Sequence, residues 1–167
     1  RQRQMCIRDS NTSIDTGQKT TLRLPIGSLP SGESVTMDLK ISRAKEEGPS
    51  LLITAGIHGD EINGVEILRR LILNGLLDQL KRGSLILIPI VNVYGFINRS
   101  REVPDGKDVN RSFPGNMSGS LAARIARTLT KKILPEVDMV VDLHTGGHGH
   151  YNYPQIRYTR GDKASEL

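Results

Sequence analysis

The sequence is poor in the residues that mark several large classes of protein. Its 167 residues include one cysteine, no tryptophan and only 4% aromatic residues. A lone Cys6 cannot form a disulfide within the chain, so a disulfide-stapled secreted scaffold is excluded and a reducing, cytoplasmic location is predicted. No apolar run approaches the roughly 18 residues that a membrane helix needs. The first ten residues also lack the apolar stretch of a secretory signal, so no membrane partner is expected.

Charge of one sign is not concentrated anywhere in the chain. The formal net charge is +5, and the three arginines and one aspartate of residues 1–10 contribute two of these charges. The remaining basic residues are scattered. A nucleic-acid surface needs a basic stripe with stacking aromatics, so no nucleic-acid partner is predicted. Residues 1–10 have no pattern that leads into the rest, and we predict a non-native or disordered tail there.

Alternation and apolar runs predict strands. Val35, Met37, Leu39 and Ile41 alternate with polar residues, which indicates a half-buried strand. Continuous apolar runs at residues 51–55, 85–91 and 137–143 predict strands buried on both faces. We expect a polar turn at 44–49. Pro89 suggests either a sheet edge or the end of its strand.

Helical periodicity separates these strands. Apolar residues at helical spacing predict a helix that begins near Ile62, and Gly75 weakens or ends this helix. A second helix is predicted over residues 121–134, with Ser118 or Ser120 as its cap. Residues 92–118 between them are predicted to be a long polar loop, and such loops are usually functional. The alternation of strands and helices predicts an α/β sheet with parallel members.

Three candidate metal ligands follow predicted strands. His58 and Glu61 come just after the 51–55 run, and His144 comes just after the 137–143 run. Two histidines and one carboxylate form the ligand set of a catalytic zinc that keeps a position open for water. A His-x-x-Glu pair alone is common and indicates little. The carboxyl ends of parallel strands meet at one edge of a sheet, so His144 makes the pattern far more specific.

The loop and strand ends carry further candidates, each with a structural alternative. Arg101 and Arg111 either are solvated loop charges or bind a carboxylate or a developing oxyanion. Asp108 and Asp142 either are turn or strand-end carboxylates or orient a ligating histidine. The segment Gly147-His148-Gly149-His150 could hold a metal ion, but a flexible polar loop over the site is the simpler interpretation.

The ordered motifs His58-x-x-Glu61, Asp108-x-Asn110-Arg111-x-Phe113-Pro114-Gly115 and Asp142-Leu143-His144 resemble the zinc carboxypeptidase superfamily. The residues of the first two motifs resemble those of its succinylglutamate desuccinylase/aspartoacylase branch. This similarity runs from about residue 20 to the end. The resemblance implies a mixed, partly parallel sheet flanked by helices in a three-layer sandwich. It also implies one Zn²⁺ per chain, with His58, Glu61 and His144 as its ligands. By the same resemblance, Asn110 and Arg111 bind the free carboxylate of the substrate, Arg101 polarises the scissile carbonyl, and Asp108 supports the first histidine.

The resemblance further implies a zinc-dependent hydrolase that cleaves the amide bond of an N-acyl amino acid or a similar small carboxylate-bearing substrate. The family's general base is a glutamate on a later strand, and no glutamate here lies in a matching motif. Residues 11–167 are therefore expected to be the N-terminal portion of a catalytic domain, truncated at the C-terminus. A metallocarboxypeptidase, an ester hydrolase and a zinc-binding but catalytically silent fragment stay open, as does the oligomeric state.

Overall fold

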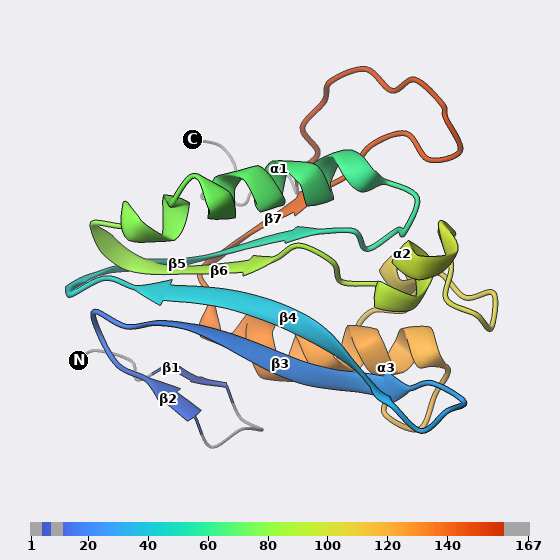
Figure 1. Ribbon diagram of the computed structural model, residues 1–167, viewed down its shortest axis with the longest axis horizontal. Helices are drawn as coiled ribbons and strands as arrows, with labels where there is room; N and C mark the ends of the chain where they lie inside the picture. Colours follow the sequence, from blue (N-terminus) through green and yellow to red (C-terminus); the bar gives the residue numbers. More distant parts are fainter. Residues whose placement is uncertain (1–4, 8–11, 159–167) are drawn as a thin grey trace.

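The computed structural model describes residues 5–7 and 12–158, and its centre is a five-stranded mixed sheet (Figure 1). The strand order is β3-β4-β6-β5-β7. Strands β3 and β4 pair antiparallel, as do β4 and β6, whereas β5 pairs parallel with both β6 and β7. The strands span the following residues: β3 Lys19–Ser28, β4 Ser34–Arg43, β5 Glu46–Ala55, β6 Arg82–Ile88 and β7 Met139–Leu143.

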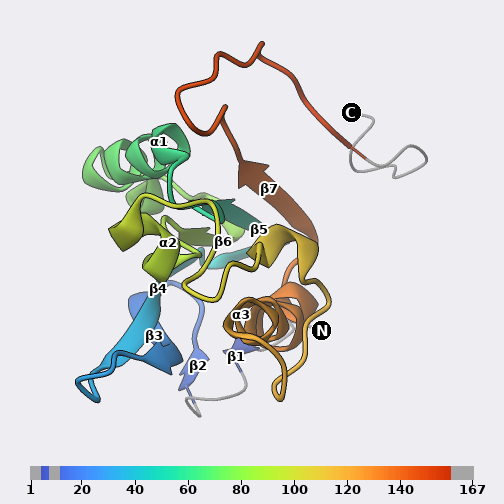
Figure 2. The ribbon, with the colours of Figure 1, turned by 90° about the vertical axis from the view of Figure 1, so that its right-hand side faces the viewer.

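Helices cover both faces of this sheet, which confirms the predicted three-layer arrangement (Figure 2). The α-helices are α1 Ile62–Leu73, α2 Val93–Asn98 and α3 Leu121–Thr128. Short 3-10 turns lie at Leu76–Asp78, Val109–Arg111 and Leu134–Glu136, and a π-helical turn at Leu129–Ile133 extends α3. Both α1 and α3 lie in connections between parallel strands, where crossover helices are expected.

The two sides of the sheet form two hydrophobic clusters. On β6, Ile86 and Ile88 join the larger cluster with Ile125 of α3, while Leu87 joins the smaller cluster with Leu68 of α1. This split follows from the alternation of side chains along a strand. Strand β4 behaves as its pattern predicts, because Val35, Met37, Leu39 and Ile41 are all buried. The sheet is thereby fixed between α1 and α3.

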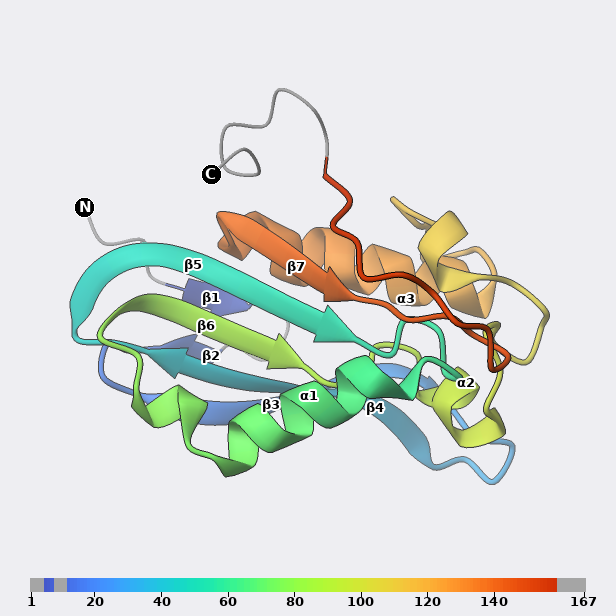
Figure 3. The ribbon, with the colours of Figure 1, turned by 90° about the horizontal axis from the view of Figure 1, so that it is seen from above.

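Strand β7 corrects one sequence prediction. The 137–143 run was expected to be buried on both faces, but Met139, Val140 and Val141 are 40%, 50% and 41% exposed. Within the described residues β7 pairs only with β5, at the end of the strand order (Figure 3). An apolar run predicts a strand, but it does not report where the strand lies in a sheet. His144 therefore follows an exposed strand.

Other boundaries also differ from the predictions. The polar turn expected at 44–49 is wrong, because β5 already begins at Glu46 and tolerates Pro49 at a register irregularity. Pro89 follows the last residue of β6, an inner strand, so it marks a strand end. The 92–118 loop is interrupted by α2, which the side chain of Asn92 caps by accepting the Gly95 N–H. Ser120 caps α3 in the same way, and Ser118 does not.

The N-terminal segment has a short ordered part. A two-stranded sheet joins β1 Met5–Ile7 to β2 Thr12–Ile14 in antiparallel register. Residues 5–7 thus take part in the fold, although the first ten residues were expected to be a tail. Residues 1–4 and 8–10 lie outside the described residues, and the non-native origin of the segment stays a prediction. Among the described helices, none has the length and apolar character to cross a bilayer.

Candidate metal centre

The turn between β5 and α1 carries the first two candidate ligands. Strand β5 ends at Ala55, whose carbonyl accepts the Val91 N–H, and the Gly56 carbonyl accepts the Asn92 N–H. Gly56 itself has a φ of 61°, in the left-handed region that glycine adopts readily. The chain thereby turns out of the sheet at the carboxyl end of β5. His58 and Glu61 follow, and α1 begins immediately after them.

This turn is seated directly on α2. The Gly59 N–H donates to the Ser100 carbonyl at 2.9 Å. A Cβ atom on Gly59 would lie 1.9 Å from the carbonyl carbon of Gly95, so only glycine permits the contact. His58 next to it is 2% exposed. The ligand turn is therefore held by backbone contacts on both sides.

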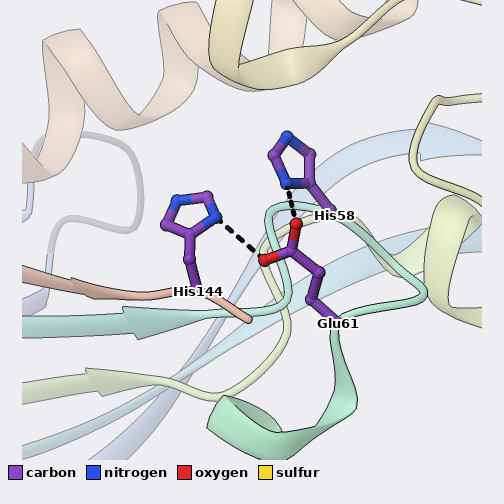
Figure 4. Close-up of side chains that lie close together, drawn as sticks. All are labelled: His58, Glu61 and His144. Atoms are coloured by element: carbon purple, nitrogen blue, oxygen red, sulfur yellow. Dashed lines mark hydrogen bonds and ion pairs between the residues drawn. The ribbon is translucent and has the colours of Figure 1, made fainter. Parts of the chain in front are cut away.

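The three predicted ligands converge, as Figure 4 shows. Glu61 lies between the histidines, with Oε1 2.7 Å from His58 Nδ1 and Oε2 3.0 Å from His144 Nδ1. One ligand atom from each residue lies within 4.8 Å of the other two. His58 and Glu61 are buried, whereas the side chain of His144 is 34% exposed. The group thus presents two imidazole nitrogens and a carboxylate toward one partly accessible point.

The second ring nitrogen of each histidine, Nε2, contacts a carboxylate. Asp108 Oδ1 lies 3.2 Å from His58 Nε2, and Asp142 Oδ2 lies 2.7 Å from His144 Nε2. Thr54 holds Asp142 by donating its hydroxyl to Oδ1 at 2.7 Å. Metal-ligating histidines usually donate their second N–H to a carboxylate in this way, which fixes the ring and raises its basicity. The arrangement therefore fits a divalent ion such as zinc held by two Nδ1 atoms and Glu61.

The same carboxylates shift the titration of their neighbours. The hydrogen bond with Asp142 raises the pKa of His144, and Glu61 adds to this, although partial burial opposes it. Burial alone would raise the pKa of Asp108. The charge of His58 and the hydrogen bonds from Arg101 and the Asn110 N–H outweigh burial, so the pKa of Asp108 lies below its ordinary value. Asp108 is thus kept ionised beside His58.

Asp108 also gathers the loop candidates at the site. It accepts hydrogen bonds on Oδ2 from Arg101 Nε at 3.1 Å and Nη2 at 2.9 Å. The third guanidinium nitrogen, Nη1, lies 3.7 Å from Glu61 Oε1 and 3.3 Å from His58 Nδ1. Arg111 lies on the outer side, 83% exposed, with Nε 3.8 Å from Asp108 Oδ2. Asn110 is exposed beside it, so all three polar residues surround one carboxylate.

Sequence reasoning missed several residues that shape the site. Asn92 is fully buried, and besides capping α2 its side-chain amide contacts the Arg101 carbonyl at 3.4 Å. Asp60 contacts His148, which lies outside the three-ligand group. Only Asn92 had a usable signal, since asparagine is a favoured helix cap. The other contacts join segments far apart in the sequence and leave no local pattern.

Comparison with known proteins gives one family. The family model for the succinylglutamate desuccinylase/aspartoacylase catalytic domain matches residues 47–167. Among curated proteins, N-alpha-acetyl-L-2,4-diaminobutyric acid deacetylase from Halomonas elongata is 37% identical over 127 residues. That alignment covers 75% of this chain and 37% of the Halomonas protein. This chain therefore spans well under half the length of that relative.

Solved structures agree with this comparison. An aspartoacylase family protein from Mesorhizobium loti superposes with a TM-score of 0.69 at 36% identity, covering 78% of this chain and 41% of that one. The product-bound ectoine utilization protein EutE (DoeB) from Ruegeria pomeroyi superposes with a TM-score of 0.66 at 34% identity, covering 77% and 40%. The observed fold is therefore the fold of the matched part of these proteins.

Proposed function

This chain belongs to the succinylglutamate desuccinylase/aspartoacylase family, and we propose that it forms the metal-binding part of a zinc-dependent deacylase acting on N-acyl amino acids. One observation carries the proposal. The Arg101 guanidinium lies beside the His58–Glu61–His144 group, with Nη1 3.7 Å from Glu61 Oε1. A cation next to an open metal centre suits a reaction in which water attacks a carbonyl and negative charge develops on its oxygen.

The residues divide the work in the proposed reaction. His58, Glu61 and His144 would hold a zinc ion, which would supply an activated water at neutral pH and polarise the acyl carbonyl. Arg101 donates hydrogen bonds to the carbonyl oxygen as its charge develops, and Asp108 keeps the guanidinium in place through Nε and Nη2. The exposed Arg111 and Asn110 bind the free carboxylate of the amino acid, because a guanidinium fork matches a carboxylate. The amide bond is then held over the metal centre.

The proton that leaves the attacking water needs an acceptor. The nearby carboxylates of Glu61, Asp108 and Asp142 are each engaged with a histidine. We propose that a glutamate beyond residue 167 accepts this proton and passes it to the leaving amine. The relatives reach well over twice the length of their matched portion, which is compatible with such a residue. The cytoplasmic location stays a prediction.

Hydrolysis of defined substrates tests the proposal. The Halomonas relative is named for an N-acetylated diamino acid, so small N-acetyl amino acids are the first substrates to try. We expect a protein that extends beyond residue 167 to release free amine from them, to lose this activity with a chelator, and to regain it with zinc. Preferential cleavage of peptides or esters would overturn the deacylase assignment. Full activity of residues 1–167 alone would overturn the proposed position of the base.

Arg111→Ala and Arg101→Ala should affect different kinetic constants. We expect Arg111→Ala to raise KM about tenfold or more with little change in kcat, because one charged hydrogen bond to the substrate carboxylate contributes roughly 1.5–3 kcal/mol. Arg101→Ala should instead lower kcat, since its contact strengthens as charge develops. Steady-state kinetics on one N-acetyl amino acid separates the two effects.

Arg99→Ala is the matched control for both variants. Arg99 is an exposed arginine in the same loop region, and we expect its solvated charge to contribute little. If Arg111→Ala left KM unchanged, Arg111 would not bind the substrate carboxylate. If Arg99→Ala raised KM as much as Arg111→Ala, the effect would come from the general positive field and not from a specific contact.

A further inference from the structure

The loop of residues 145–150 follows His144 and is tied to the ligand turn at several points. The Thr145 N–H donates to Glu61 Oε2 at 2.8 Å. Asp60, which precedes Glu61 in the ligand turn, accepts the His148 N–H on Oδ2 at 3.1 Å, and the same oxygen lies 3.3 Å from His148 Nδ1. In Figure 1 the orange-red segment after β7 leaves the sheet beside the start of α1. The 145–150 loop thus rests on Asp60 and Glu61 together.

The contact between Asp60 and the 145–150 loop is close. A Cβ atom on Gly147 would lie 2.6 Å from Asp60 Oδ2, so a larger residue would push the loop or the carboxylate away. His148 has a φ of 55°, a left-handed conformation that is unfavourable for a side chain with a Cβ. The His150 N–H closes the turn around His148 by donating to the Gly147 carbonyl, and the two contacts to Asp60 Oδ2 tie that turn to the ligand turn. The loop is therefore fastened to Asp60 at a tight turn.

His144 needs such a fastening more than His58 does. His58 lies in a buried turn held by backbone contacts to Asn92 and Ser100, whereas His144 follows an exposed edge strand. Apart from Asp142 on its own strand, the ring of His144 has its polar contact with Glu61. The side chain of Asp60 is only 11% exposed, and its Oδ1 finds no hydrogen-bond donor among the described residues. Asp60 is thus a mostly buried carboxylate whose described contacts are to the loop that directly follows the third candidate ligand.

We propose that Asp60 is a positioning residue for the metal centre: it fastens the 145–150 loop through the His148 backbone and so keeps His144 within reach of the other ligands. Neighbouring residues of the ligand turn then have separate tasks, since Glu61 would hold the metal ion and Asp60 would keep the third ligand in place. The proposal rests on the proposed zinc site, because positioning matters only if an ion is bound. It also gives His148 a role that does not require its ring to be a ligand.

Zinc affinity measured by competition with a chromogenic chelator tests this role. We expect Asp60→Ala to weaken zinc binding about 10–100-fold, as is typical when a residue that supports a ligand is removed. Asp60→Asn keeps an oxygen that accepts the His148 N–H, so its affinity should stay within a few-fold of wild type although the charge is lost. Gly147→Ala keeps Asp60 but displaces the loop, and it should reproduce the loss seen in Asp60→Ala.

Amide hydrogen exchange of the metal-free protein supplies a second readout. The N–H groups of Thr145 and His148 should exchange faster in Asp60→Ala than in wild type or Asp60→Asn. His148→Ala keeps the backbone N–H, so its zinc affinity should fall only a few-fold. If Asp60→Ala does not fold, Gly147→Ala gives the same comparison.

The possible failures can be told apart. A wild-type protein that binds no zinc would overturn the proposed function, and this proposal with it. A wild-type protein that binds zinc while Asp60→Ala and Gly147→Ala bind it equally well would overturn only the positioning role. If Asp60→Asn were as weak as Asp60→Ala, the charge of Asp60 would be the cause and not the fastening. A tenfold or larger loss in His148→Ala would assign the role to the imidazole ring.

Discussion

Replacing Glu61 with glutamine is expected to abolish stoichiometric zinc binding. Glu61 contacts both His58 Nδ1 and His144 Nδ1, and it also accepts the Thr145 N–H. Glutamine has almost the same shape, but it is neutral, and its NH₂ group cannot accept a hydrogen bond or bind a metal ion. We expect zinc affinity to fall by more than the roughly 100-fold upper range for residues that only support a ligand. Metal content after dialysis and chelator competition measure the change.

Glu66→Gln is the matched control for Glu61→Gln. Glu66 lies on an exposed face of α1, the helix that begins directly after Glu61. Hydrogen bonds from Arg69 and Arg70 hold the pKa of Glu66 at about 2. It is therefore fully ionised at neutral pH, so both substitutions remove one negative charge. Zinc binding by Glu66→Gln should equal that of wild type. A Glu61→Gln protein that still held one zinc per chain at wild-type affinity would show that Glu61 is not a ligand.

The convergence of the three candidate ligands could be predicted from the sequence because it depends on strand ends. His58 and His144 each follow an apolar run, and β5 and β7 prove to be parallel neighbours, in register from Leu51↔Met139 to Ala55↔Leu143. Two short-range patterns and one topological rule were therefore enough to bring distant residues together. Strand β4 was equally predictable, because its alternation records which face is buried.

The remaining features depend on tertiary contacts that leave no local pattern. The 137–143 run looked like a buried strand, but its exposure is decided by what packs against β7. The sequence allowed two interpretations of Arg101, as a solvated charge or as part of the site. Its position is decided by Asp108, whose two oxygens are divided between His58 and the guanidinium. The contact of Asp60 with the 145–150 loop likewise joins residues 88 positions apart.

Gly59→Ala is the substitution from which we expect the largest loss of stability. The added Cβ would lie 1.9 Å from the Gly95 carbonyl carbon and 2.2 Å from the Phe96 nitrogen. Both are backbone atoms of α2, so no side-chain rotation can relieve the overlap. Overpacking within a core usually costs about 1–3 kcal/mol, and a clash between two backbone segments should fall at or above the upper end. Urea unfolding of the metal-free protein should show this as a lower midpoint.

Gly59→Ala should lower zinc affinity more than a substitution elsewhere that costs the same free energy of unfolding, because Gly59 directly follows His58. Moving the turn away from α2 weakens the Gly59 N–H contact to the Ser100 carbonyl and displaces His58 from Asp108. Gly32→Ala in the β3–β4 hairpin is a useful comparison. It has a φ of 89° but open space around the added Cβ, so it should destabilise the fold through backbone strain and leave zinc affinity unchanged. An unchanged urea midpoint and unchanged zinc affinity for Gly59→Ala would mean that the turn is not seated on α2 as described.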